Sequence, residues 1–348
     1  MAKLTERDFK KEVTAKAFSK IYLIYGDEKY LVRHYTSFLV NKAVGKNPTE
    51  FDLIRLGSDT PLENIFAASR QISMFSEIKC VLVSDYDIDA LSEGDYHLLE
   101  QFTSEIPDGT ILIFSMPTLI KDVKKSGKLK KLAQTAAKAG TVLELEKKED
   151  IALEQQLVTW AEKRNCTLSR INASKIIAMC STDMTTLHNE MEKLCAYADG
   201  REITEKMIYL LVVKSSEARI FALSDCVVRN DFNAAYQQLH RLLEQNEKPE
   251  IILSVLSSAF IDMYRMKMAS ESGVTAAQVA ADFKYGKREF LLRNAANNAK
   301  KYSAATLRNI LNIILDTDIK LKSTRASSRI LLETLLSELM LAMKEGSQ

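Results

Sequence analysis

The sequence predicts an α/β protein in which a parallel five-stranded sheet with flanking helices is followed by helices alone. Short apolar runs rich in β-branched and aromatic residues alternate with helical stretches over the first ~145 residues. After residue 147 these runs stop and only helical periodicity remains. With 348 residues, 46% of them hydrophobic, the chain is long enough for two or three folded domains.

Five apolar runs are the expected strands. Helical sequence separates them at intervals of 25–30 residues, which favours right-handed crossovers and therefore a parallel sheet. Gly26, Gly57 and Gly140 mark turns beside the runs. The runs are IYLIY (21–25), FDLIRL (51–56), CVLVSD (80–85), TILIFS (110–115) and TVLELE (141–146). The first predicted domain therefore covers residues 1–146.

A small helical domain is expected at residues 147–212. Residues 151–211 contain the pattern of three or four short helices, with turns at RNCTLS and ADGREIT. Thr204 is expected to cap the last of these helices, because its hydroxyl can accept a hydrogen bond from a free backbone N–H. We expect Trp160 in the core of this domain rather than in a binding site.

A larger helical domain is expected at residues 213–348, with Pro249 in the first turn of one long helix. Near the C-terminus, apolar residues recur at the 3–4 spacing of a single helix face: Leu307, Ile310, Leu311, Ile314 and Leu315. Asp318 and Lys322 lie one turn apart and are expected to form a surface ion pair.

The charge and the N-terminus exclude several classes of protein. The net charge of +2, from 48 basic and 46 acidic residues, gives no global attraction to nucleic acid or to a membrane. The segment MAKLTERDFKKEV lacks the apolar core of a signal peptide, and no apolar stretch reaches the ~18 residues of a membrane span. We therefore expect a cytoplasmic protein that makes no membrane contact.

Cysteine and histidine give no support for a metal or redox site. The five cysteines are odd in number, show no CxxC spacing and lie in apolar surroundings, so we expect reduced core thiols: Cys80, Cys166, Cys180, Cys195 and Cys226. The four histidines are scattered: His34, His97, His188 and His240. Neither set has the spacing of a zinc site.

The first turn from strand to helix, IYLIYGDEKYLV, has the layout of a P-loop without its chemistry. The motif GxxxxGK[ST] needs a second Gly, a phosphate-binding Lys and a hydroxyl for magnesium. Counted from Gly26, these positions hold Leu31, Val32 and Arg33. Asp27 and Glu28 are expected to cap the helix N-terminus, where a phosphate would otherwise bind. No nucleotide or other cofactor is therefore expected.

Asp85 permits two interpretations. CVLVSDYD could be an apolar strand ending in a magnesium-binding carboxylate, which would favour an ATPase. Strands that end in Asp are common, and the missing P-loop Lys favours a structural role. The sequence contains no GxSxG or HExxH motif, so nucleophilic and zinc chemistry lack support.

Six segments, in order and spread over nearly the whole chain, resemble the delta subunit family of the bacterial DNA polymerase III clamp loader. They are YLIYGDEKYLV, MFSEIKCVLVSD, FSMPTLIKDVKKSGKLKKLAQ, LHNEMEKLCAYADGREIT, the stretch from IFALSDCVV to LSSAF, and ILDTDIKLKSTRASSRILLETLLSEL. The resemblance implies a degenerate AAA+ fold: a nucleotide-binding-type domain without ATP, a helical lid and a collar that oligomerises. It also implies a non-enzymatic subunit that opens the beta sliding clamp for loading onto primed DNA. The implied partners are that clamp, the gamma/tau and delta-prime subunits, and primer–template DNA.

The resemblance also suggests a role for Met74 and Phe75, which lie among polar residues just before the third apolar run. In this family a hydrophobic pair at the matching position inserts into a pocket of the sliding clamp, and here Ser73 and Ser76 flank the pair. The alternative is that both side chains pack under the sheet as ordinary core. The residues alone favour neither interpretation.

A lysine cluster could contact DNA phosphates: Lys121, Lys124, Lys125, Lys128, Lys130 and Lys131. Of these, Lys124, Lys125 and Lys128 are the candidate contacts. Lysines around the start of an amphipathic helix more often form a solvated face, and aromatic residues for base stacking are missing. Two other functions stay open for the whole chain: an active AAA+ ATPase, and a helical scaffold without a link to replication.

Overall fold

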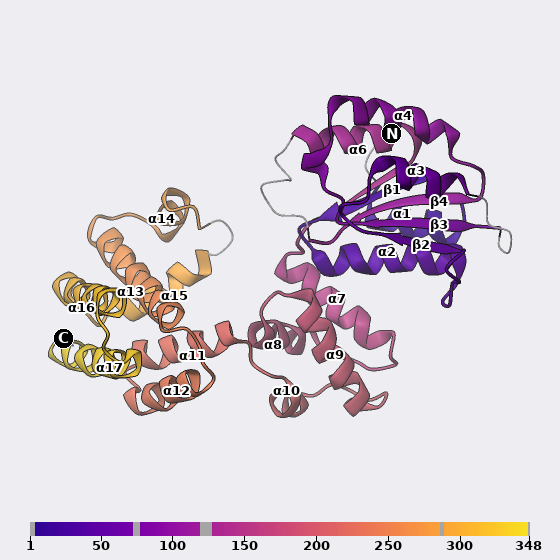
Figure 1. The fold of residues 1–348 in the computed structure, drawn as a ribbon. Helices are drawn as coiled ribbons and strands as arrows, with labels where there is room; N and C mark the ends of the chain where they lie inside the picture. The colour runs from indigo at the N-terminus through magenta and orange to yellow at the C-terminus, as the bar shows by residue number, and fades with distance from the viewer. Residues whose placement is uncertain (1–3, 72–76, 119–126, 286–288, 347–348) are drawn as a thin grey trace. The chain divides into compact units, whose positions relative to one another are not determined.

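The computed structural model describes residues 4–71, 77–118, 127–285 and 289–346. The chain forms two compact units, Met1–Gln156 and Leu157–Gln348 (Figure 1). The expected division of the helical sequence into a lid at 147–212 and a collar at 213–348 stays a prediction. In the described residues no helix is long and apolar enough to cross a membrane.

The first unit is built on a five-stranded parallel sheet with the strand order β2-β3-β4-β1-β5. β1 and β4 are buried along their whole length, which explains why they read as continuous apolar runs. The predicted sheet is confirmed, and each strand matches its predicted run to within two residues. The strands are β1 (Ile21–Gly26), β2 (Leu53–Leu56), β3 (Lys79–Ser84), β4 (Thr110–Met116) and β5 (Thr141–Leu145).

Helices cover both faces of this sheet (Figure 1). Alternate residues of β1 point to opposite faces. Leu23 lies in an apolar core with side chains of α3, α4 and α6, whereas the Tyr22 ring packs edge-on against Phe9 of α1. The helical segments are α1 (Glu6–Thr14), α2 (Lys29–Val44), α3 (Leu62–Arg70), the 3-10 turn η1 (Ile88–Ala90), α4 (Glu93–Glu105) and α6 (Gly127–Ala139).

The second unit is formed by helices, the first of which, α7, begins within the first unit. Two sequence predictions are confirmed here: the Thr204 hydroxyl accepts a hydrogen bond from the Met207 N–H, and Pro249 begins α13. Trp160 is buried and packs edge-on against His188, as expected of a core residue. The helices are α7 (Asp150–Glu162), α8 (Arg170–Cys180), α9 (Met184–Ala198), α10 (Glu205–Leu211), α11 (Ser216–Val228), α12 (Phe232–Glu244), α13 (Pro249–Glu271), α14 (Ala276–Asp282), α15 (Glu289–Ala299), α16 (Ala304–Ser323) and α17 (Ser328–Glu345).

The predicted apolar face of α16 is wrong at one position. Ile310 and Ile314 are buried, Leu311 is half-buried, and Leu315 is 55% exposed. Each four-residue step rotates about 40° beyond a full turn, so the row that includes Leu311 and Leu315 drifts away from the core. The predicted ion pair is confirmed on the same helix, because Lys322 Nζ lies 2.6 Å from Asp318 Oδ2.

Candidate functional site

The residues expected to bind a sliding clamp, Ser73, Met74, Phe75 and Ser76, lie outside the described residues, as do Lys121, Lys124 and Lys125. The described chain ends at Gln71 before this segment and resumes at Glu77 after it. The segment therefore connects the end of α3 with the start of β3. We use the word frame for the contacts that Phe66 and Arg70 make before the segment and that Lys79 and Gly109 make after it.

The chain that leads into the segment is attached to α4. The Phe66 ring of α3 stacks on Phe102 of α4, with the ring centroids 3.9 Å apart. The Arg70 guanidinium lies 5.3 Å from the centroid of the same Phe102 ring and pairs with Glu105. Stacked aromatic rings and a cation over a ring face both stabilise the contact. The last turn of α3 is thus fixed immediately before the segment begins.

Lys79, the first residue of β3, is buried and joins the two ends of the frame. Its side chain is directed to the C-terminus of α3, where Nζ donates hydrogen bonds to Ala68 O at 2.7 Å and Gln71 O at 2.8 Å. Ala68 O belongs to the last turn of α3, where carbonyls lack an intrahelical partner, and Gln71 O belongs to the extended C-cap residue. Burial lowers the pKa of the Lys79 ammonium. Lys79 is not among the residues predicted from the sequence, although a lysine that opens a buried strand is a usable signal.

Gly109 packs against the chain where it resumes after the segment, at Glu77 and Lys79. Its carbonyl accepts a hydrogen bond from the Lys79 backbone N–H at 2.7 Å. A Cβ at Gly109 would lie 2.5 Å from Glu77 O, and the φ of +84° is left-handed. Glycine is therefore required for the backbone to approach this closely.

Two of the P-loop positions hold side chains that pack in the core, and Gly26 makes a close backbone contact. Leu31 is 3% exposed and Val32 is 0% exposed, whereas Arg33 is exposed. A Cβ at Gly26 would lie only 1.9 Å from Leu145 O. Gly26 therefore allows β1 to approach β5, and that role needs no phosphate.

Glu28 occupies the helix N-terminus where a P-loop would hold phosphate. Its carboxylate accepts a hydrogen bond from the Tyr30 N–H at 3.3 Å, and its own N–H donates to Leu145 O at 3.2 Å. The expected capping by Glu28 is confirmed. A carboxylate at this position is stabilised by the positive end of the helix dipole and repels an incoming phosphate.

Asp85 follows β3 and makes two backbone contacts. Its N–H donates to Ser115 O, and its Oδ1 accepts from the Thr118 N–H, both at 2.8 Å. Its φ of +50° is in the left-handed region that Asp tolerates better than most residues. These bonds tie the end of β3 to the turn after β4, in agreement with the structural interpretation.

The described lysines of α6 contact neighbouring elements. Lys128 Nζ donates to Asp89 O, and Lys131 pairs with Glu93 of α4 while lying 4.8 Å from the centroid of the Tyr96 ring. Such contacts join α6 to α4 and neutralise part of the charge. Lys130 is exposed. The geometry of Lys128 and Lys131 fits a solvated helix face.

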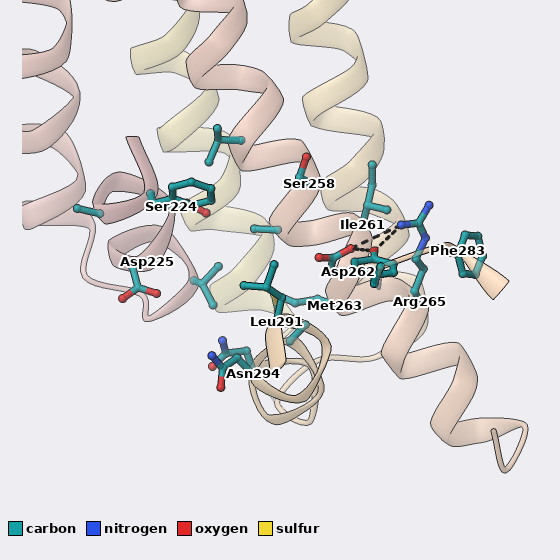
Figure 2. Close-up of a pocket in the computed structure, with 18 of the residues that line it drawn as sticks. Ser224, Asp225, Ser258, Ile261, Asp262, Met263, Arg265, Phe283, Leu291 and Asn294 are labelled. Carbon is teal, nitrogen blue, oxygen red and sulfur yellow. Dashed lines mark hydrogen bonds and ion pairs between the residues drawn. The ribbon is translucent and has the colours of Figure 1, made fainter. Parts of the chain in front are cut away.

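A cavity of about 1010 Å³ lies in the second unit, lined mainly by α11, α13 and α15 (Figure 2). At one side, Tyr285 OH donates to Asp262 and accepts a hydrogen bond from Arg265 at 2.6 Å. The Arg265 guanidinium also lies 4.1 Å from the centroid of the Phe283 ring. These polar groups satisfy one another, and much of the remaining wall is alanine and serine. No sequence motif pointed to these residues.

Two family models match the chain: DNA polymerase III, delta subunit, over residues 22–144, and the C-terminal domain of that subunit over residues 217–339. DNA polymerase III subunit delta of Bacillus subtilis is 24% identical over 328 residues, which cover 92% of each chain. A probable DNA polymerase III subunit delta of Aquifex aeolicus is 21% identical over 262 residues, 73% of this chain and 72% of the relative.

A solved structure has the same fold. The Bacillus subtilis DNA clamp loader delta protein is 22% identical, and the match covers 96% of this chain and 99% of that protein with a TM-score of 0.60. Together the two family models include most of the first unit and most of the C-terminal helices. The chain belongs to the DNA polymerase III delta subunit family.

Proposed function

We propose that this protein is the clamp-opening subunit of a bacterial DNA polymerase III clamp loader. It binds the beta sliding clamp through Met74 and Phe75, with Ser73 and Ser76 beside them, and opens the clamp for loading onto primed DNA. Its family membership supports a role in replication. The relative with the same fold is a DNA clamp loader protein. The proposed setting is the cytoplasm, with gamma/tau and delta-prime subunits as partners in the loader.

The observation that carries the proposal is the frame around residues 72–76. Lys79 Nζ, which follows the segment, donates a hydrogen bond to Gln71 O, which precedes it. Gly109 lies against Glu77 O, where the described chain resumes. Burying a Met and a Phe side chain in a partner contributes about 3–6 kcal/mol before association costs. If the contact is stronger with a distorted ring, binding shifts the clamp toward its open form by that difference in affinity.

The second part of the proposal is that this subunit does not hydrolyse ATP. The P-loop positions support it, because Leu31 and Val32 are packed in the core and Glu28 caps α2. A phosphate at this turn would meet the Glu28 carboxylate, and the position of the P-loop lysine holds Val32. Catalysis in the loader is then supplied by other subunits, and this chain is no enzyme by itself.

Clamp binding is tested by replacing Met74 and Phe75 together with alanine. We expect the variant to fold normally and to lose binding to the organism's own clamp in a pull-down and in size-exclusion chromatography. The matched control replaces Phe51 and Leu98, which are exposed apolar residues of the same unit, and should bind as the wild type does. Unchanged binding by the Met74/Phe75 variant would contradict the assignment. A wild-type chain that never co-elutes with the clamp would favour the scaffold hypothesis.

Titration of a fluorescent ATP analogue tests the absence of nucleotide binding. We expect no saturable signal up to about 1 mM, which corresponds to a binding free energy weaker than about −4 kcal/mol. Micromolar affinity would favour the active AAA+ ATPase and would contradict our interpretation of Leu31 and Val32.

The alternative to a solvated lysine face is direct DNA contact by Lys124, Lys125 and Lys128 in the assembled loader, and the salt dependence of DNA binding tests it. Each phosphate contact adds about 0.9 to the slope of log affinity against log salt. Replacing Lys124 and Lys125 with alanine should therefore reduce this slope by about two, whereas replacing Lys131, which pairs with Glu93, should not. An unchanged slope would show that these lysines form a solvated face.

A further inference from the structure

A short linker, residues 212–215, joins α10 to α11 within the second unit. Lys214 is exposed, so burial does not hold this part of the linker. The Lys214–Ser215 peptide group is instead bound on both sides. The Ser215 N–H donates a hydrogen bond to Met179 O in the last turn of α8 at 2.8 Å. Lys214 O accepts a hydrogen bond from Arg219 Nη1 of α11 at 2.6 Å. One peptide group thus connects α8 with α11.

Arg219 is itself held by two further acceptors. Its Nη2 donates hydrogen bonds to Ser216 Oγ at 3.1 Å and to Glu247 Oε1 at 3.0 Å. The Arg219 and Glu247 side chains are 21% and 14% exposed, so water and salt screen this ion pair less than a surface pair. Arg219 Nε is buried without a hydrogen-bond partner in the part of the chain that the structure describes. The two terminal nitrogens therefore fix the guanidinium against Lys214 O.

A cavity of about 480 Å³ lies beside the linker. The end of α8, the α9 residue Glu190, the linker and the start of α11 line this cavity. A close-packed interior resists the movement of one helix against another, whereas unfilled space permits it. A short exposed linker with few buried contacts is also a segment that opens locally at low cost. The linker could therefore bend as a hinge if Lys214 O were released.

We propose that Arg219 and Glu247 form a lock on this hinge. While Arg219 binds Lys214 O, helices α8–α10 move together with the helices from α11 onward, and release of the peptide group lets the linker bend into the cavity. The inference goes beyond the proposed function and does not depend on clamp binding, because the locking contacts all lie within the second unit. Its failure would leave the clamp assignment untouched.

Limited trypsin digestion of the folded full-length chain measures how often the linker opens. Trypsin cleaves after Lys214, and when closing is fast the cleavage rate follows the population of the open form. Arg219→Met keeps the apolar stem and removes the donors, so we expect cleavage after Lys214 to be about tenfold faster, as located by mass spectrometry. Arg219→Lys keeps the charge on a single nitrogen and should be cleaved at least about threefold faster. Glu247→Gln keeps the side-chain shape and should also be cleaved about threefold faster, so it serves if Arg219→Met does not fold.

Arg229→Met is the matched control. Arg229 lies on the same helix and pairs with Asp225, but its side chain is 73% exposed and contacts no part of the linker among the interactions of the described residues. Cleavage after Lys214 should therefore proceed at the wild-type rate in this variant. A tenfold increase in Arg229→Met as well would overturn the inference, because it would show that loss of any arginine from α11 opens the linker.

Hydrogen–deuterium exchange separates local opening from a general loss of stability. In Arg219→Met the Ser215 amide should exchange faster in step with cleavage, because this N–H is bound to Met179 O across the linker. Exchange in α13 should stay at the wild-type rate. Wild-type cleavage in folded Arg219→Met or Glu247→Gln would overturn the inference, as would an equal acceleration of exchange in α13.

Discussion

Replacing Val32 with alanine tests whether the former phosphate position has become part of the core. Val32 is 0% exposed on α2 and stands where a P-loop has its lysine. Removing two buried carbon groups costs about 1.6 kcal/mol in transfer free energy. The cavity left behind adds to this cost, because a packed helix relaxes only in part. We expect the free energy of unfolding of the first unit to fall by about 2–3 kcal/mol.

The assay is urea unfolding followed by far-ultraviolet circular dichroism, with Arg33→Ala as the matched control one residue along the same helix. Arg33 is exposed, so its replacement should change stability by less than about 0.5 kcal/mol. The Val32 variant should show a lower transition midpoint with an unchanged slope. If the two variants behave alike, the Val32 side chain is not packed, and a nucleotide at this turn must be reconsidered.

Three further predictions concern stability. Gly26→Ala places a methyl carbon 1.9 Å from the Leu145 carbonyl of β5, so we expect the free energy of unfolding, followed by a thermal melt, to fall by at least about 2 kcal/mol. A melting temperature equal to that of the wild type would contradict the close approach. A hydrogen bond from Ser216, followed by the charge of a neighbouring arginine, lowers the pKa of Glu247. The Glu247 carboxylate stabilises the fold at any pH above its ordinary pKa, and this contribution is lost as the pH falls through the lower pKa of the folded state. Ser216→Ala should therefore make the free energy of unfolding fall less steeply with decreasing pH. A double-mutant cycle on Asp318 and Lys322 should give a coupling of about 0.3–0.5 kcal/mol, and a value above about 1 kcal/mol would indicate a role beyond a surface pair.

Elements whose side chains all lie in the same kind of environment, such as a fully buried strand, could be predicted from the sequence. β1 and β4 stand out because they are buried along their whole length. Pro249 starts α13 because its fixed φ suits a first turn. Leu315 was wrongly assigned to the buried face of α16, because the 3–4 spacing does not show where a row of side chains turns away from the core. The resemblance to the delta subunit family, rather than periodicity, supplied the role of Met74 and Phe75.

Lys79 could have been noticed as a lysine that opens a buried strand, but its hydrogen-bond partners could not be predicted from the sequence. The bonds of Lys79 go to carbonyls of α3, and a backbone acceptor leaves no mark on the identity of its residue. The sequence PDG at residues 107–109 indicates a turn. The contact of Gly109 with Glu77 O depends on how β3 and β4 align in the sheet. Both features depend on tertiary packing, which local patterns do not encode.

The P-loop-like turn after β1 and the start of β3 lie at opposite ends of the strands of one parallel sheet. Ligands of open α/β sheets bind beyond the carboxyl ends of the strands, and there the Glu28 carboxylate caps α2. Residues 72–76 precede β3, and Lys79 and Gly109 lie at the amino edge. We therefore expect the two ends to respond separately: Val32→Ala lowers stability and spares clamp affinity, whereas the Met74/Phe75 double-alanine variant loses clamp affinity and keeps its stability. Equal loss of affinity in both variants, after both are shown to be folded, would mean that clamp binding reports only the integrity of the whole sheet.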